Sequence, residues 1–378
     1  MEFTDNLEKF DIGLITSKTY FDSSAANNNN RSPVVAKHPS DGGIAFDSTG
    51  VITWIPMDAP EAIRGLCYRH NQSFGIEFEL THDDFDHPMM LNNEWARIAE
   101  ELRQVLADYL PLGTVAEQVG GEDKRVWNVK FDGSCGWEVT SRVLRNQEGF
   151  KEVVTACDAL TDCIKPMGLK VNFRTGTHIH LGWLGRTVSE VRRAIELARL
   201  FEPALGTLVS PSRLVHYSGE FNCYNSTEPN PYCQPVSTFY SRQMLEEVHT
   251  RDQLLFLQNR DESRYVTFNI CPLERIYTVE SRMHNGAHEA EKILLWVSLW
   301  MQMMWAAAHR DSIPSVPDCK VIIPSGDILH LAKTYLAVGG GVADEFLARL
   351  GRRRMQIVDL WRAYPELHPW LQYPATWR

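Results

Sequence analysis

Carboxylate and imidazole side chains recur at alternate positions in segments that have the composition of β-strands. Glu77 and Glu79 in FGIEFEL, and His178 and His180 in THIHLGW, are each two residues apart. Alternate residues of a strand point to the same face of a sheet. Two carboxylates on one face repel each other unless a cation lies between them, and an H-x-H pair is either hydrogen-bonded or metal-binding. The two pairs therefore predict either a metal site or a polar sheet face.

Three further segments carry charged and polar side chains of similar types. In FDGSCGWEVTS, SRYVTFNI and TVESRMH these are Asp132, Glu138, Arg264, Asn269, Glu280 and Arg282. Glu280 and Arg282 again share one strand face. They are either a surface ion pair of little energetic value or a metal-binding carboxylate beside a guanidinium for phosphate. Asp132 lies in an Asp-Gly-Ser turn signal, so its simplest interpretation is a turn residue.

If these strands share one sheet, its open face carries four carboxylates, two imidazoles and an arginine. Hard oxygen ligands then outnumber imidazoles, which favours Mg²⁺ or Mn²⁺ over zinc. Several carboxylates favour more than one ion. Divalent cations beside arginines are what a phosphoryl-transfer site needs, because both neutralise charge on nucleotide phosphates.

The segments around these residues predict the elements that must position them. We expect strands in SFGIEFELT, RVWNVKFDGS, GWEVTSRVL, LKVNFRTGTHIHLGWL, SRYVTFNICP and RIYTVESRMH, and helices over 92–110, 148–166, 187–208, 287–309, 325–337 and 341–363. The third helix begins with a T-x-x-E capping box, Thr187 to Glu190. This order predicts an α+β fold: a mainly antiparallel sheet with helices packed on one face and the active site on the other.

The remaining segments set the predicted domain organisation. Residues 1–40 are polar and of low complexity, so we expect poor order. We expect an N-terminal extension with short strands over 41–71, a catalytic domain over 72–310, and a C-terminal helical extension packed on it over 311–378. Residues 210–240, rich in Pro, Asn and Ser, predict a long irregular loop. The run Arg352–Arg354 predicts a solvated helix face.

Composition excludes several classes of protein. The net charge of −10 argues against nucleic-acid binding, because an acidic chain repels phosphate backbones. The most apolar stretch, 293–308, is too short to span a bilayer and predicts a buried helix. The eight cysteines form no C-x-x-C pair, and the N-terminus is acidic where a signal peptide needs basic residues. We therefore expect reduced thiols and a cytoplasmic protein that contacts neither membrane nor nucleic acid.

The order of five motifs, FGIEFEL, KFDGSCGWEVTS, GTHIHLGW, RYVTFNI and VESR, resembles the amidoligase family, over about residues 72–300. This family belongs to the superfamily of glutamine synthetase and glutamate–cysteine ligase. The resemblance implies a glutamine synthetase-like sheet, ATP as co-substrate, and Mg²⁺ (or Mn²⁺) as the metal. It implies that a carboxylate is phosphorylated and that an amine then attacks the acyl phosphate to form an amide. The expected partners are ATP and a carboxylate and an amine, each a small molecule or peptide; the superfamily also includes homo-oligomers.

The resemblance also implies a role for each matching residue. Metal ligands are expected at Glu77, Glu79, Glu138, His180 and Glu280. Nucleotide contacts are expected at Arg282, Arg264, Asn269, His178 and Lys130, and catalytic contacts at Arg282, Arg264, Lys130 and Asp132. The substrates do not transfer with the resemblance. A guanidino phosphotransferase of the same fold and a zinc-dependent hydrolase using the H-x-H motif remain the alternatives.

Overall fold

The computed structural model describes residues 45–46, 52–54, 72–82, 92–121, 123–183, 187–218, 223–258, 264–336 and 341–362. Two short strands, β1 (Ala45–Phe46) and β2 (Ile52–Trp54), pair antiparallel. The two strands predicted between 43 and 56 are therefore confirmed. The poorly ordered segment predicted for residues 1–40 lies outside the described residues.

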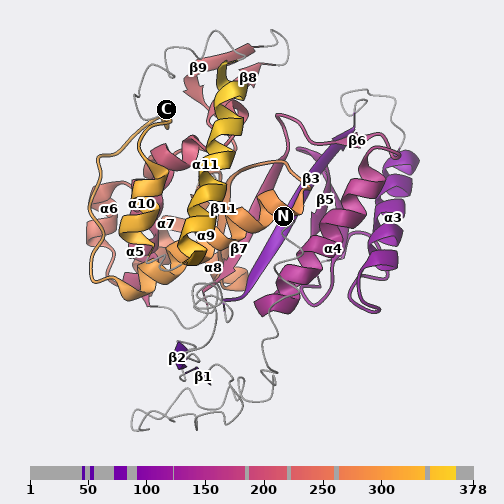
Figure 1. Cartoon of the computed structure of the whole chain (residues 1–378), viewed down its shortest axis with the longest axis horizontal. Helices are drawn as coiled ribbons and strands as arrows, with labels where there is room; N and C mark the ends of the chain where they lie inside the picture. The colour runs from indigo at the N-terminus through magenta and orange to yellow at the C-terminus, as the bar shows by residue number, and fades with distance from the viewer. Residues whose placement is uncertain are drawn as a thin grey trace.

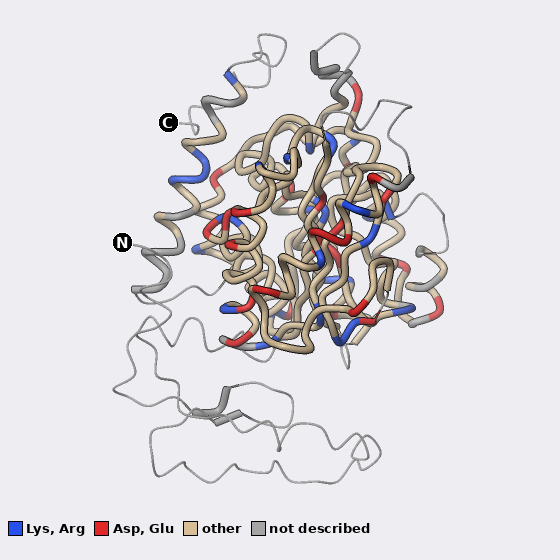
Figure 2. The backbone as a smooth tube through the Cα atoms, turned by 90° about the vertical axis from the view of Figure 1, so that its right-hand side faces the viewer, with Lys and Arg blue, Asp and Glu red and all other residues tan. Residues whose placement is uncertain are grey.

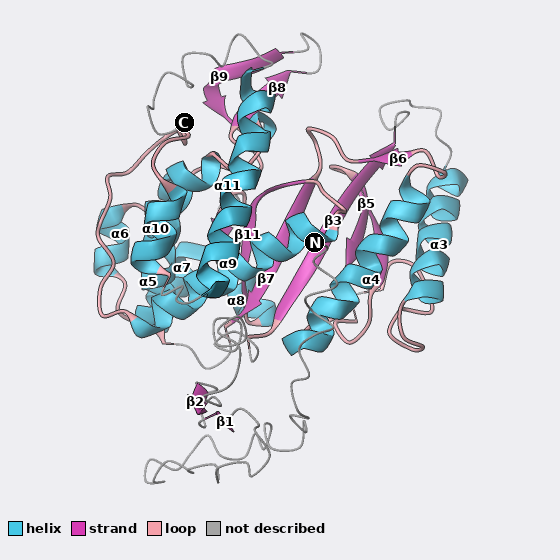
Figure 3. Ribbon diagram, in the orientation of Figure 1, coloured by secondary structure: helices cyan, strands magenta, loops and turns pink. Residues whose placement is uncertain are grey.

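A seven-stranded sheet forms the centre of the molecule (Figure 3). Its strands are β3 (Phe74–His82), β4 (Asn128–Asp132), β5 (Gly136–Thr140), β6 (Leu169–Lys170), β7 (Gly176–Gly182), β10 (Phe268–Asn269) and β11 (Thr278–Asn285). They lie in the order β10-β11-β7-β3-β5-β4, and β6 pairs with the end of β3. Every one of these pairings is antiparallel, which confirms the predicted α+β class.

One face of this sheet is apolar and covered by helices. The apolar residues of β3, among them Phe74, Ile76 and Phe78, are almost fully buried. The helices α3 (Asn92–Tyr109), α4 (Asn146–Ile164) and α9 (Ala290–His309) lie over this face (Figure 1). Phe268 of β10 stacks on Trp300 of α9 with ring centroids 5.4 Å apart. Burial of these apolar surfaces fixes the strand faces, since a one-residue slip would turn the apolar residues outward.

The helix α9 is the buried helix that the apolar stretch 293–308 predicts. Most of its residues are buried, including the polar Gln302. None of the helices in the described ranges combines the length and the apolar character that crossing a membrane requires. Next to it packs α5 (Val188–Gly206), which begins with the predicted capping box between Thr187 and Glu190.

The segment 210–240 differs from the prediction of an irregular loop. It contains the 3₁₀ turns η3 (Pro211–Arg213) and η4 (Val236–Thr238), and the strands β8 (Val215–Ser218) and β9 (Cys223–Pro229), which form an antiparallel hairpin (Figure 1). The prediction was wrong because cross-strand hydrogen bonds satisfy the backbone here, and composition alone does not reveal such pairing.

The segments SRYVTFNICP and RIYTVESRMH form shorter strands than predicted. Only Phe268 and Asn269 pair with β11, since the preceding backbone turns to Gln234, whose carbonyl accepts from Thr267 N (2.9 Å). The helix α8 (Pro272–Ile276) occupies the start of the second segment, because a proline is well tolerated in the first turn of a helix.

The remaining helices are α6 (Arg242–Glu247), α7 (Arg251–Gln258), α10 (Ile328–Tyr335) and α11 (Gly341–Arg362). In α11, Arg353 and Arg354 are buried, so the prediction of a solvated arginine face is wrong for these two residues. The Arg353 guanidinium donates to Leu208 O and Asn285 Oδ1, both at 3.2 Å. A long side chain with several donors thus contacts backbone and side-chain oxygens at the end of α5 and of β11.

Candidate functional site

Strand register brings the predicted site residues together on the sheet face opposite α3, α4 and α9. The cross-strand partners are Glu77 with His178, Glu79 with Glu138, Glu138 with Lys130, His180 with Glu280, and Glu280 with Asn269. Directly opposite residues in antiparallel strands lie close enough for their side chains to touch. Figure 2 shows acidic and basic positions close together in the middle of the view.

His178 lies at the centre of the carboxylates and is almost fully buried. Its Nδ1 lies 3.2 Å from Glu77 Oε2 and 3.2 Å from Glu280 Oε1. Its Nε2 lies 3.3 Å from Glu79 Oε1. One imidazole therefore contacts three carboxylates that come from two strands.

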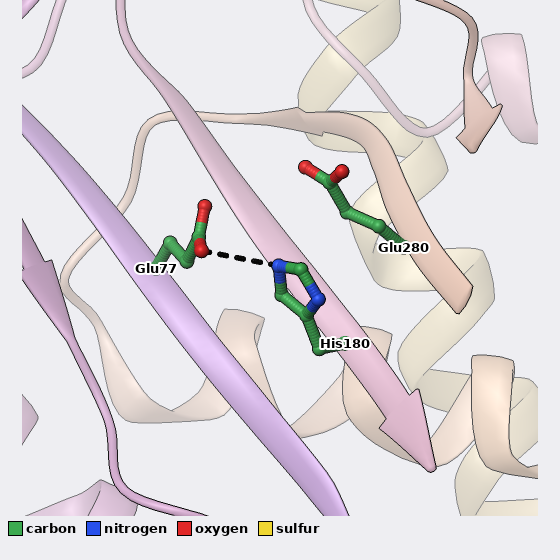
Figure 4. A group of neighbouring side chains, drawn as sticks. All are labelled: Glu77, His180 and Glu280. Atoms are coloured by element: carbon green, nitrogen blue, oxygen red, sulfur yellow. Dashed lines mark ion pairs between the residues drawn. The ribbon is translucent and has the colours of Figure 1, made fainter. Parts of the chain in front are cut away.

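His180 forms a second contact with the same group. Its Nε2 lies 3.1 Å from Glu77 Oε1, and its Nδ1 lies 3.0 Å from the Thr278 hydroxyl. One potential ligand atom each from Glu77, His180 and Glu280 lies within 4.8 Å of the others (Figure 4). Such a set of two carboxylates and one imidazole fits a single divalent cation.

The ring nitrogens give a second reason to expect a cation. The Nε2 atoms of His178 and His180 are buried and make no hydrogen bond of acceptable geometry with the described residues, although each is close to a carboxylate. A buried polar atom without a partner is costly. A ligand that engages these nitrogens and the surrounding oxygens would remove that cost, so the residues present fit a divalent metal.

The electrostatics of the cluster depend on burial and on close opposite charges. Burial raises the pKa of Glu77, but the imidazoles of His180 and His178 outweigh it and hold this pKa well below the usual range. Burial lowers the pKa of His180, but the facing Glu77 carboxylate raises it above its ordinary value. Burial and repulsion from Glu77 raise the pKa of Glu138 to about 7, although Lys130 opposes this. Negative charge is thus concentrated at Glu77, beside the imidazoles.

Basic and amide groups hold the outer carboxylates. Lys130 Nζ lies 2.7 Å from Glu138 Oε1. Glu280 accepts from Asn269 Nδ2 at 2.6 Å and from Arg282 Nη1 at 2.6 Å. Charge-assisted contacts of this length are strong and directional, so they fix the carboxylates in place before any ligand binds. Asn269 therefore contacts a carboxylate here, although the sequence predicted a nucleotide contact.

A cavity of about 570 Å³ lies over this face. Its lining includes the predicted residues Glu77, Glu79, Asp132, Glu138, His178, Arg264 and Arg282. The predicted residues Lys130, His180, Asn269 and Glu280 are not part of this lining; each contacts a residue that is. A cavity of this size is typical of small-molecule sites.

Two predicted residues have a place that qualifies their role. Asp132 accepts from Ser134 N (2.7 Å) and Ser134 Oγ (2.5 Å), so it stabilises the β4–β5 turn as well as lining the cavity. Arg264 is exposed, and its guanidinium lies over the Tyr265 ring at 4.6 Å. It is therefore at the rim of the cavity, whereas Arg282 is in contact with the carboxylates.

The structure adds lining residues that the sequence reasoning missed. These are Ser134, Phe173, Arg174, Ser212, Arg213, His216, Asn230, Pro231, Tyr232 and Tyr265. Most come from turns and from the segment around β8 and β9, where no periodicity indicates which side chains point inward. The pair Tyr232 and Tyr265, with rings 5.6 Å apart, forms an aromatic edge beside Arg264.

Comparison with known proteins places this geometry in context. The chain matches the family described as "Putative amidoligase enzyme" over residues 70–304, more than half of its length and the segment that carries all five motifs. No curated protein sequence matches it.

Several solved structures are similar to the chain. One is a novel glutamine synthase homolog (TM-score 0.44, 13% identity, 88% of this chain and 77% of that chain). Another is a GmaS/ADP complex (TM-score 0.43, 11% identity, 81% and 73%). A third is the complex of the prokaryotic ubiquitin-like protein Pup with its ligase PafA (TM-score 0.34, 11% identity, 82% and 62%). Likenesses of this size carry no information about substrates.

Proposed function

This chain belongs to the putative amidoligase enzyme family, as its motifs predict, and we propose that it joins a carboxylate to an amine through an acyl phosphate formed from ATP. The prediction of an ATP-dependent amide-forming ligase is confirmed at the level of the family; the intermediate, the metal and the roles below are our proposal. The observation that carries the proposal is the buried cluster of four glutamates and two histidines under the cavity, with Arg282 beside it.

The proposed reaction has two steps. In the first, an oxygen of the substrate carboxylate bonds to the γ-phosphorus of ATP, the bond from that phosphorus to the β–γ bridging oxygen breaks, and ADP leaves. In the second, the amine nitrogen bonds to the acyl carbon, the bond from this carbon to the phosphate oxygen breaks, and phosphate leaves. The nitrogen loses a proton as the amide forms.

Glu77, His180 and Glu280 would hold one divalent cation, and Glu79 and Glu138 lie where they would hold another. The predominance of oxygen ligands favours Mg²⁺ or Mn²⁺. When bound, such a cation neutralises charge on the nucleotide phosphates. A Zn²⁺ hydrolase would use the two imidazoles as its main ligands, whereas here each imidazole lies against carboxylates.

Arg282 would stabilise the phosphoryl group during transfer. Its Nη1 is held by Glu280 at 2.6 Å, and its Nε approaches Tyr232 O at 3.5 Å. The guanidinium is thus oriented before the substrate arrives, which is how preorganised charge lowers a barrier. Lys130, held by Glu138, would contact the nucleotide from the other side of the sheet face. Arg264 would act at the rim.

The hairpin of β8 and β9 would cover the reacting groups. His216 of β8 lines the cavity, as do Asn230 and Tyr232 directly after β9. An acyl phosphate is destroyed by water, so a ligase of this kind needs a cover over its site. This keeps the role predicted for residues 210–240, now assigned to a hairpin instead of an irregular loop.

Trapping with hydroxylamine tests the acyl phosphate. Purified protein is incubated with ATP, Mg²⁺, hydroxylamine and a panel of amino acids and dicarboxylates, and hydroxamates are detected by mass spectrometry. We expect a hydroxamate that requires both ATP and Mg²⁺ and is absent with Glu77→Gln. A guanidino phosphotransferase would instead phosphorylate arginine or creatine in a parallel assay, and a zinc hydrolase would act without ATP. Either result would overturn the proposal.

A further inference from the structure

Arg213 is a buried guanidinium in the wall of the cavity. It is the last residue of η3, and only 3% of it is exposed. It lines the cavity together with Glu79, His178 and Arg282. The sequence gave no reason to select it, because it belongs to none of the strands that carry the motifs.

The charge of Arg213 has no carboxylate partner among the described residues. Its Nη2 donates to the carbonyl oxygen of Arg282 at 2.6 Å, while its Nε is buried without a hydrogen bond. By contrast, Arg282 is paired with Glu280 at 2.6 Å. A buried charge without a counterion is unfavourable, and a bound anion would provide the missing partner.

The guanidinium faces the catalytic carboxylates across a single glycine. A Cβ atom on Gly176 would lie 3.1 Å from Nη1 and Nη2 of Arg213 and 3.0 Å from Nε2 of His178. The Gly176 amide also donates to Glu79 Oε2 at 2.5 Å. Only a residue without a side chain allows these groups to approach so closely. Arg213 is thus next to the place where the metal site and the cavity meet.

Several contacts fix the position of Arg213. Asn230 Nδ2 donates to Ser212 O at 2.5 Å, and Asn230 N donates to Leu214 O at 3.1 Å, so one asparagine holds both flanking residues. The Arg282 carbonyl that accepts from Arg213 also accepts from the Cys233 thiol at 3.3 Å. This carbonyl lies in the part of β11 where the register shifts, between Ser281 and His284. A rigid donor fork of this kind suits carboxylate or phosphate.

We propose that Arg213 binds the oxyanion at the reacting centre, either the substrate carboxylate or the transferring phosphoryl group. The proposal rests on the proposed function and adds to it a residue that touches substrate. The positive charge of Arg282 is balanced by Glu280, whereas that of Arg213 is available to a ligand. Both candidate anions present two or more oxygens, which the guanidinium can engage at once.

Calorimetric binding to Arg213 variants tests this. The probes are Mg²⁺ with ADP, Mg²⁺ with the non-hydrolysable analogue AMP-PNP, and inorganic phosphate. The variants are Arg213→Met, which removes the charge, and Arg213→Lys, which keeps the charge but loses the fork. Arg242→Met is the matched control, because Arg242 is exposed on α6 and pairs only at the surface with Glu246. Thermal unfolding of each variant checks the fold.

If the anion is the phosphoryl group, Arg213→Met binds AMP-PNP and phosphate about 10- to 100-fold more weakly, as expected for one charge-assisted contact. Its affinity for ADP stays as in the wild type, and Arg213→Lys is intermediate. If the anion is the carboxylate, all nucleotide affinities stay unchanged, and KM for the carboxylate that supports hydroxamate formation rises by a similar factor.

A folded Arg213→Met protein with wild-type affinity for AMP-PNP, phosphate and that carboxylate would overturn the proposal. Failure of the proposed function is a different result: the wild type itself would then bind no ADP with Mg²⁺, whereas phosphate binding would still report on Arg213.

Discussion

Replacing Glu202 by glutamine should change how the stability of this protein depends on pH. Glu202 is a buried residue of α5, and its Oε1 accepts from Val236 N at 2.8 Å and from the Thr267 hydroxyl. Burial raises the pKa of this carboxyl to about 7, although these hydrogen bonds and Arg199 oppose it. The residue lies outside the metal cluster, so the effect is independent of any bound cation.

The sign follows from proton binding. With a folded-state pKa of about 7 against a reference value of 4.5, the folded protein binds this proton more tightly than the unfolded chain. The resulting stability is fully present below pH 4.5 and is lost as the pH rises through 7. At about 1.4 kcal/mol per pKa unit, the loss between pH 5 and pH 8 is roughly 2–3 kcal/mol.

The assay is urea unfolding of wild type and Glu202→Gln at pH 5 and pH 8. Glutamine keeps an oxygen for the Val236 amide but does not titrate. We expect the free energy of unfolding of the wild type to fall by roughly 2–3 kcal/mol more than that of the variant over this interval. Asp318→Asn, at a half-exposed carboxylate paired with Arg199, is a control for the neighbouring charge. Equal pH dependence of wild type and Glu202→Gln would refute the reasoning.

Three further predictions concern the site. Gly176→Ala should lower the free energy of unfolding by about 1–3 kcal/mol and weaken ligand binding, because its Cβ would crowd Arg213 and His178; urea unfolding and calorimetry measure both, and wild-type values would contradict the close approach. Arg282→Met should reduce kcat for hydroxamate formation about 100-fold, as expected for a lost charge contact in the transition state, whereas the exposed Arg264→Met should change it less than 10-fold; equal effects would place Arg264 on the floor of the cavity. Glu280→Ala should destabilise the protein by about 3–5 kcal/mol, since it leaves the Arg282 guanidinium buried without its counterion, and unchanged urea unfolding would contradict that pairing.

The two-residue period of the strands was sufficient to predict which side chains share a face. Glu77 and Glu79, or His178 and His180, point the same way whatever their strand pairs with. The sequence does not state which strands are neighbours, and the contact between His178 and three carboxylates depends on β7 lying between β3 and β11. That order is set by long-range packing of the apolar face.

Arg213 and the β8–β9 hairpin show why the rest could not be predicted. Arg213 lies in a three-residue turn, where no period relates sequence position to direction. Its role depends on Gly176, Asn230 and the Arg282 carbonyl, which come from three other parts of the chain. Polar composition around 215–229 predicts a loop by propensity, while hydrogen bonds between the two strands override that propensity.

The most direct test of the proposed site is calorimetric titration of ADP into the wild type, with Mg²⁺ and with EDTA, and into Glu77→Gln and Glu280→Gln. We expect binding that requires Mg²⁺ in the wild type and is at least 10-fold weaker in both variants, because each loses a ligand of the cluster. Thermal unfolding confirms that the variants are folded. Binding of ADP that is indifferent to Mg²⁺ and to both substitutions would contradict a nucleotide–metal site on this sheet face.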